Sequence, residues 1–376
     1  MKSYKTLMLG SVATSALLLG AVSSPVLAGN VDVGHKKGSF YLQTKDGKWS
    51  ALPSGQIQVR YTYQAVDDGS GADDTTSIAA RRVRFGIGGR AGNKKLTYKI
   101  SLNISSDSEA DVDGDPGVSI FDSYLNYKFS KALQLRAGVW KQRYTDQHSN
   151  SSAKLQFVDR SDSDSRIRAD RDMGIGIRGG LFKMLNYELT VVNGNTRKAP
   201  TSDNGSHGFV GHIRVAPLGK YGNAYEGDIK NSKKLKVQVS ASGRLLNDVD
   251  FSTRAINTFI SRAGHANVYG WTAGAGLKWR GFGLHGEYGQ VKLIDTDTTA
   301  TGGDKLTGMK TVGWNIEASY FLIPKKWSVA GRYEYRNENT FTNNGGGTAA
   351  VKDNVGLADQ TSYGLATSYF IRGQAH

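Results

Sequence analysis

Residues 54–66 read SGQIQVRYTYQAV, and after a polar loop residues 79–92 read AARRVRFGIGGRAG. Over residues 56–65 apolar side chains alternate strictly with polar ones. Because successive side chains of a β-strand point to opposite faces, this alternation predicts a strand with one apolar and one polar face. The second segment repeats the pattern, with Arg82 and Arg84 on its polar side. We interpret the pair as two strands with lipid on one face and water on the other.

The same alternation recurs along the chain, most regularly in residues 95–104, 234–242 and 269–279. Long polar connections alternate with short turns, except that residues 217–233 are long where a short turn is expected. Such a chain is typical of outer-membrane β-barrels, which have an even number of strands. We therefore predict an all-β protein, a transmembrane antiparallel β-barrel of about 16 strands, with about 14 or 18 as alternatives. It should have short periplasmic turns, long extracellular loops and one loop folded into the lumen.

The first 28 residues have the pattern of a secretory signal peptide. Residues 1–28 have Lys2 and Lys5 near their start, continue with a short apolar run and end with Ala28. This pattern predicts cleavage and export to the outer membrane, with a membrane anchor as the alternative. We assign residues 29–54 to an N-terminal periplasmic segment or a first hairpin, and residues 55–376 to the barrel.

The composition is consistent with a barrel whose interior holds water. The chain has 376 residues, 38% of them hydrophobic, and no cysteine. That hydrophobic fraction is low for a large globular core but sufficient where only one face of each strand is apolar. Aromatic residues lie on the apolar side of many strands, as expected at the edges of a membrane, although a soluble β-sandwich would also contain them. These patterns predict outer-membrane lipid and lipopolysaccharide as partners.

The polar side of the predicted strands carries many more basic than acidic residues, and the formal net charge is +15. Rings of arginine and lysine that line a pore favour anions, and guanidinium groups bind phosphate oxygens in pairs. We therefore expect small anions, and not nucleic acid, as partners. The alternative is that the charges only solvate the lumen or pair with nearby acids. The predicted anion path is lined by Arg60, Arg82, Arg84, Lys99, Arg136, Lys141, Arg143, Arg178 and Lys236.

Residues 141–171 form the longest polar stretch, KQRYTDQHSNSSAKLQFVDRSDSDSRIRADR. A connection of this length is either disordered or functional. In a wide barrel we expect it to fold into the lumen as a constriction loop. The alternative is an external loop that shields the mouth of the channel.

Other candidate sites are weak. Asp111, Asp113 and Asp115 could supply oxygen ligands to calcium, but the downstream spacing of an EF-hand is missing. A solvated acidic loop is the favoured interpretation. The histidines show no metal-ligand spacing, and no grouping of serine, histidine and acid indicates a hydrolase. We predict neither a cofactor nor an enzymatic activity.

The sequence resembles the phosphate-selective porin O/P family over most of the predicted mature chain. The segments that carry the resemblance are GQIQVRY from Gly55, RRVRFGIGGRAGNKKLTYKISL from Arg81, FDSYLNYKFSKALQLRAGVWKQRY from Phe121, LQFVDRSD from Leu155, RDMGIGIRGG from Arg171 and WNIEASYFLIPKKWSVAGRYEY from Trp314.

The resemblance implies an outer-membrane barrel of about 16 strands, usually a homotrimer. It implies an anion channel whose inward loop and lumen carry arginines and lysines. It also places RRVR on a strand that faces the lumen and residues 138–162 at the constriction loop.

We therefore predict an outer-membrane porin that passes small anions such as phosphate by passive diffusion. One alternative is a porin with little or different selectivity. Another is a structural or adhesive barrel whose lumen is plugged.

Overall fold

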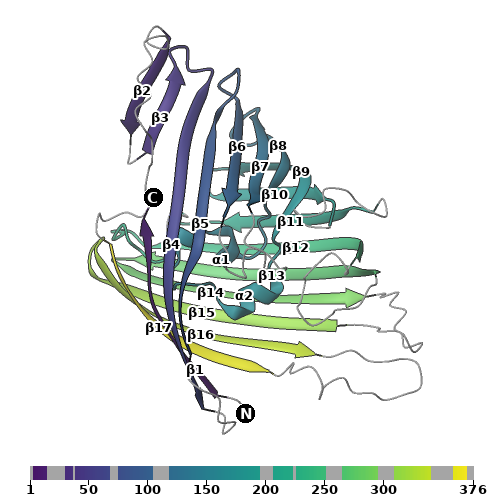
Figure 1. Cartoon of the computed structure of the whole chain (residues 1–376). Helices are drawn as coiled ribbons and strands as arrows, with labels where there is room; N and C mark the ends of the chain where they lie inside the picture. Colours follow the sequence, from purple (N-terminus) through teal and green to yellow (C-terminus); the bar gives the residue numbers. More distant parts are fainter. Residues whose placement is uncertain are drawn as a thin grey trace. The chain divides into compact units, whose positions relative to one another are not determined.

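The computed structural model describes most of the chain (Figure 1). The described residues are 3–14, 30–36, 39–67, 75–104, 118–194, 206–222, 226–250, 265–294, 309–339 and 359–370. The chain divides into two compact units, unit 1 with residues 1–127 and residue 376, and unit 2 with residues 128–375. Within the described ranges, every helix is too short or too polar to cross a membrane.

Unit 1 is built from antiparallel strands. They are β1 (Ser3–Thr14), β2 (Val31–Lys36), β3 (Ser39–Thr44), β4 (Ser50–Asp67), β5 (Thr75–Arg90), β6 (Leu96–Asn103) and β7 (Ser119–Lys128). Strand β4 pairs with β1 and β5, and β6 pairs with β5 and β7. The register of β4 and β5 sets Gln58 opposite Arg82, so the polar sides of the two strands coincide as predicted.

The N-terminal assignments remain predictions. Strand β1 lies inside the predicted signal peptide and pairs with β4 over residues 57–67. Strands β2 and β3 form an antiparallel hairpin within residues 29–54, and β4 begins in that segment, at Ser50.

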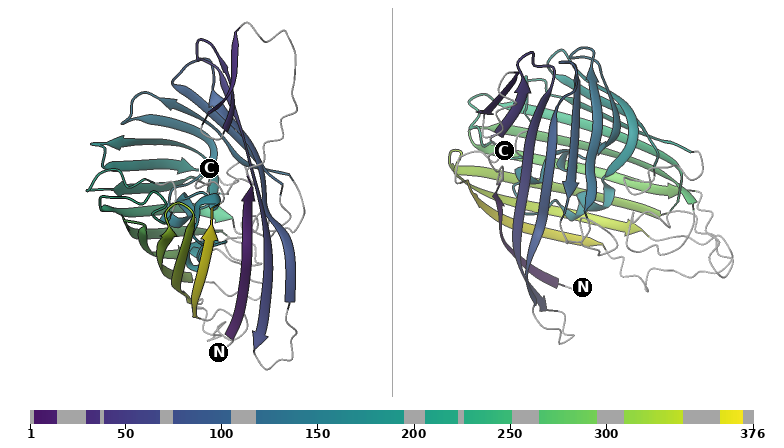
Figure 2. Two further views of the ribbon diagram at one scale, coloured as in Figure 1. Left: turned by 90° about the vertical axis from the view of Figure 1, so that its left-hand side faces the viewer. Right: turned by 45° about the horizontal axis from the view of Figure 1, so that its top comes forward.

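Unit 2 is a continuous antiparallel sheet that Figure 2 shows from two further sides. Its strands are β8 (Gln134–Lys141), β9 (Arg171–Leu181), β10 (Leu185–Val192), β11 (Gly208–Val215), β12 (Lys236–Asp250), β13 (His265–Trp279), β14 (Phe282–Ile294), β15 (Met309–Ile323), β16 (Trp327–Asn339) and β17 (Gln360–Tyr369). With β1 set aside, the described residues hold sixteen strands, β2 to β17, which agrees with the predicted number.

The two faces of the unit 2 sheet differ as the alternation predicts. Apolar side chains such as Val239, Trp271 and Ile316 are exposed, whereas Gln238 and Thr272 beside them are buried. This is the reverse of a soluble protein, in which apolar side chains are buried. An exposed apolar face is stable only against lipid or another apolar surface.

Short turns join β9 to β10, β13 to β14 and β15 to β16, as predicted. Residues 280 and 281, between β13 and β14, both have positive φ, and Gly281 adopts this conformation without the Cβ strain of other residues. The predicted long loops at 68–74, 105–117, 195–205, 251–264, 295–308 and 340–358 lie outside the described residues. The described parts of the long 216–235 connection include buried Tyr221, Asp228 and Ile229.

Candidate functional site

The segment between β8 and β9 lies on the polar face of the unit 2 sheet (Figure 1). It contains two short helices, α1 (Asp146–Ser149) and α2 (Asp162–Ile167), and the 3-10 turn Ser152–Lys154. Helix α2 packs against β14, β15 and β16. The predicted loop therefore folds against the inner wall of its own sheet. We name residues 142–170 the inner loop.

Asp146 is the main ionic contact between the inner loop and the sheet. Its Oδ1 lies 2.6 Å from Nη2 of Arg214, and its Oδ2 accepts hydrogen bonds from Ser240 at 2.6 Å and Gln238 at 3.2 Å. Burial alone would raise the pKa of Asp146, but Arg214 and His285 outweigh burial and lower it. The Asp146 carboxylate is therefore charged at neutral pH and compensates Arg214.

Three glutamates of the wall hold the inner loop through hydrogen bonds. Glu287 on β14 accepts the backbone N–H groups of Asp146 at 2.7 Å and Gln147 at 3.3 Å. Glu334 on β16 accepts the N–H of Asp162 at 2.7 Å. Glu317 accepts the Gln147 side-chain amide at 2.6 Å. The first helical N–H groups have no partner within a helix, so a carboxylate placed there satisfies them. These acids fasten the loop.

Glycines on the polar face allow the inner loop to approach the sheet closely. A Cβ on Gly270 would lie 2.5 Å from the Tyr144 hydroxyl, and one on Gly313 would lie 2.9 Å from Ser163 Cβ. A Cβ on Gly289 would overlap Ile167. A larger side chain at these positions would therefore force the loop away from the wall.

Three of the predicted lining residues come together in unit 2. Arg143 Nε lies 3.6 Å from Glu188 Oε2, and Arg178 Nη1 lies 3.4 Å from the same oxygen. The positive charge of Arg136 also acts on Glu188. Trp140, whose ring lies 5.7 Å from the Arg136 guanidinium carbon, donates its indole N–H to Glu188 Oε1 at 3.0 Å. We call Arg136, Arg143 and Arg178 the arginine cluster.

The arginine cluster is concentrated positive charge. Burial, and then the charges of Arg178 and Arg214, lower the pKa of Arg143 to about 10, while Glu188 acts in the opposite direction. Arg143 nevertheless stays protonated at neutral pH. Two guanidinium groups, those of Arg143 and Arg178, therefore face one carboxylate oxygen, which leaves a local surplus of positive charge.

The other predicted residues of unit 2 have different surroundings. Lys141 donates to the backbone carbonyls of His148 at 2.8 Å and Asn150 at 3.0 Å, so it helps to shape the inner loop. Lys236 lies opposite Lys278 in the register of β12 and β13, which brings two lysines together on the polar face.

The predicted residues of unit 1 lie on the polar side of β4, β5 and β6. Arg82 donates to Gln58 Oε1 at 2.9 Å, and Lys99 pairs with Asp122 at 2.7 Å. Arg84 donates to Asn103 at 3.1 Å and lies 4.0 Å above the ring of Phe121. Arg60 follows Gln58 on the same side of β4, beyond a register shift. The bulge at this shift buries Arg81 beside Arg82, although simple alternation would separate them.

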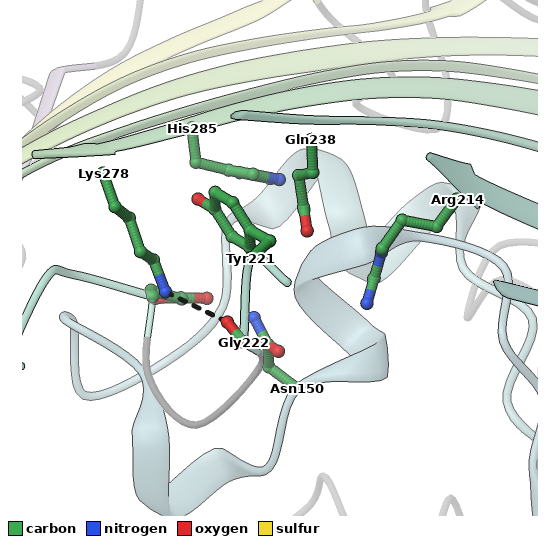
Figure 3. Close-up of a pocket in the computed structure, with 8 residues that line it drawn as sticks. Asn150, Arg214, Tyr221, Gly222, Gln238, Lys278 and His285 are labelled. Carbon is green, nitrogen blue, oxygen red and sulfur yellow. Dashed lines mark hydrogen bonds between the residues drawn. The ribbon is translucent and has the colours of Figure 1, made fainter. Parts of the chain in front are cut away.

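A small polar pocket lies between the inner loop and the 216–235 connection (Figure 3). Lys278 donates to the Gly222 carbonyl at 3.4 Å and lies 4.6 Å from the centre of the Tyr221 ring. Glu226 accepts the N–H of Gln156 in the inner loop at 2.9 Å. Burial, reinforced by Glu317, raises the pKa of Glu226 well above its ordinary value, which favours the neutral carboxyl. Residues 216–235, which stand where the loop pattern predicts a short turn, thus form a second segment that contacts the inner loop.

The sequence did not single out Asp146, Glu188, Arg214 or Lys278 as site residues. Glu188, Arg214 and Lys278 are recognisable as charged residues on the polar side of a strand. Nothing in the local sequence distinguishes them from the other charged residues on that side. The glycines on that side were a better signal, because they mark where another segment approaches. Among the described residues no group of acids and histidines could hold a metal ion. The weak calcium candidates, Asp111, Asp113 and Asp115, lie outside them.

An antiparallel sheet with an exposed apolar face, a polar face and an inward-folded loop defines an outer-membrane porin. The chain belongs to the phosphate-selective porin O and P family, whose model matches residues 23–373. No curated protein sequence matches the chain significantly.

Several solved porin structures are similar over most of their length. OmpT of Vibrio cholerae is 10% identical, with 90% of this chain and 85% of that chain covered and a TM-score of 0.47. The channel DcaP of Acinetobacter baumannii is 13% identical, with 87% and 99% covered and a TM-score of 0.42. The anion-selective porin from Comamonas acidovorans is 10% identical, with 98% and 99% covered and a TM-score of 0.33.

Proposed function

We propose that this porin passes small anions such as phosphate by passive diffusion, with no chemical step. The observation that carries the proposal is the arginine cluster, in which Glu188 is opposed by Arg136, Arg143 and Arg178. A surplus of fixed positive charge attracts anions and repels cations, and planar guanidinium groups match the oxygens of phosphate. Within unit 1, the arginines of β4 and β5 and Lys99 of β6 give that sheet a basic polar side of its own.

The inner loop gives this charge its effect. A wide aqueous pore screens fixed charges over about 8 Å at physiological salt, so selectivity needs a narrow passage. The inner loop brings Arg143 close to Arg136 on β8 and Arg178 on β9, and it narrows the passage beside them. An anion that passes there would lose part of its water and gain guanidinium contacts instead.

Ion selectivity tests the proposal directly. The purified protein, reconstituted into a planar bilayer with a salt gradient, should give a reversal potential of the sign that marks anion preference. Arg143→Gln and Arg178→Gln should each reduce this preference. Arg280→Gln is a matched control, because Arg280 is exposed on the turn between β13 and β14. A pore that prefers cations would exclude anion transport.

A weakly selective porin is the second candidate, and specific ion pairs favour it. Arg332 pairs with Glu317 at 3.3 Å, and Arg336 pairs with Asp162 at 2.9 Å. Where each arginine has an acid, little net charge acts on a passing solute. Equal permeation of chloride and potassium would support this candidate. A different alternative, a barrel with a plugged lumen, would show no swelling of liposomes in a small solute.

We also propose a homotrimer, as the family resemblance implies. Exposed apolar side chains on β5 to β7 of unit 1, such as Phe85, Ile120 and Leu125, could contact lipid or a second copy. Crosslinking of the detergent-solubilised protein should give a species of three chains. A monomer at every crosslinker concentration would contradict the proposal.

A further inference from the structure

The position between the two arginines that contact Glu188 is already occupied by a protein oxygen. Glu188 is 3% exposed, and its Oε1 is held by the Trp140 indole. Its Oε2 faces Arg143 and Arg178, at 3.6 Å and 3.4 Å. No described side chain donates a hydrogen bond to this buried oxygen.

An unsatisfied carboxylate oxygen near two guanidinium groups has the chemistry of a bound anion. A phosphate or carboxylate oxygen of a solute would seek the same place, because two guanidinium groups face it. A buried carboxylate oxygen without a hydrogen bond is costly, so the site itself is not arranged to hold Glu188 as tightly as possible.

We propose that Glu188 is a specificity-determining residue that competes with solute anions for the arginine cluster. This inference rests on the proposed anion path. The fixed carboxylate repels an approaching anion and occupies part of the guanidinium surface, so each anion binds weakly and leaves quickly. A channel needs such a compromise, because binding must be strong enough for entry and weak enough for exit.

The competition also favours solutes with more than one negative charge. A fixed carboxylate carries one charge and cannot leave, whereas a phosphate dianion has two charges and several oxygens. The dianion can contact Arg143 and Arg178 while Glu188 stays in place. Chloride has a single charge and no such geometry, so it gains less from the cluster.

The test is the concentration at which the single-channel conductance is half-saturated in potassium phosphate. Glu188→Gln removes the charge and leaves a carbonyl oxygen for the Trp140 N–H. Its half-saturation concentration should fall at least about fivefold, which is the effect expected for removal of one charge at about 4 Å even in water. Glu188→Asp keeps the charge but moves it away from both arginines. The half-saturation concentration of this variant should therefore fall by less than that of Glu188→Gln.

Asp46→Asn is the control, since it makes the same change of charge on the short turn between β3 and β4, where the half-exposed Asp46 pairs with Lys48 at 3.7 Å and lies apart from the predicted anion path. Its half-saturation concentration should stay near that of the wild type. An unchanged value in both Glu188 variants, or an equal fall in Asp46→Asn, would overturn the role of Glu188. A wild-type channel without anion preference would overturn the proposed function itself, and this result appears before any variant is measured.

Discussion

Replacement of Asp146 by asparagine should detach the inner loop from the wall. The Asp146–Arg214 pair is 2.6 Å long, and the two side chains are 2% and 5% exposed. Removal of one partner from a buried ion pair typically costs about 3–5 kcal/mol, because the other charge stays buried without compensation. Ser240, Gln238 and Arg214 all donate hydrogen bonds to Asp146. Asparagine cannot accept all of them, since only one of its two terminal side-chain atoms is an acceptor.

Asp162→Asn is a matched control for this experiment. Asp162 pairs with Arg336 at 2.9 Å, but its side chain is 40% exposed, so loss of its charge should cost only about 0–1 kcal/mol. Both variants remove one negative charge from the same loop. They differ in the burial of the pair that is broken.

Two measurements report the position of the loop. A loss of about 3 kcal/mol changes an equilibrium by more than about a hundredfold, so a transient open state would become observable in Asp146→Asn. Single-channel recordings should then show a larger or strongly fluctuating conductance. Trypsin should cleave at Lys154 or Arg166 faster than in the wild type. Identical behaviour of Asp146→Asn and Asp162→Asn would refute the assignment of Asp146 as the main anchor.

The other predictions concern packing and pH. Gly289→Val should displace Ile167 and raise the conductance, at a cost of about 1–3 kcal/mol, whereas Gly243→Val, where a Cβ meets nothing within 4 Å, should leave single-channel currents unchanged. Because the pKa of Asp146 is lowered, its contribution to loop docking should persist from neutral pH down to about pH 4 and be lost only at lower pH. Trypsin sensitivity that rises already at pH 6 would contradict this assignment.

The sequence alone determined the strands and their two faces. A period of two follows from backbone geometry, so alternation in residues 56–65 predicted an apolar and a polar face without knowledge of any partner strand. Loop lengths then predicted an outer-membrane barrel, and the length of residues 141–171 predicted their inward course. The strand limits differ more from the prediction: alternation predicts a strand over residues 234–242, whereas β12 extends over Lys236–Asp250, with a register shift near its end.

Only the tertiary structure decided which charges are compensated. Asp146 and Arg214 are 68 positions apart, and Glu287 accepts the N–H of a residue 141 positions away. Alternation gives the side of the strand on which a residue lies, but not its height along the wall or the loop segment beside it. Alternation places Arg178 and Arg214 alike on the polar side of a strand, although only Arg178 is in the predicted lining. In the structure Arg214 has its own carboxylate, whereas Arg178 shares Glu188 with two other arginines.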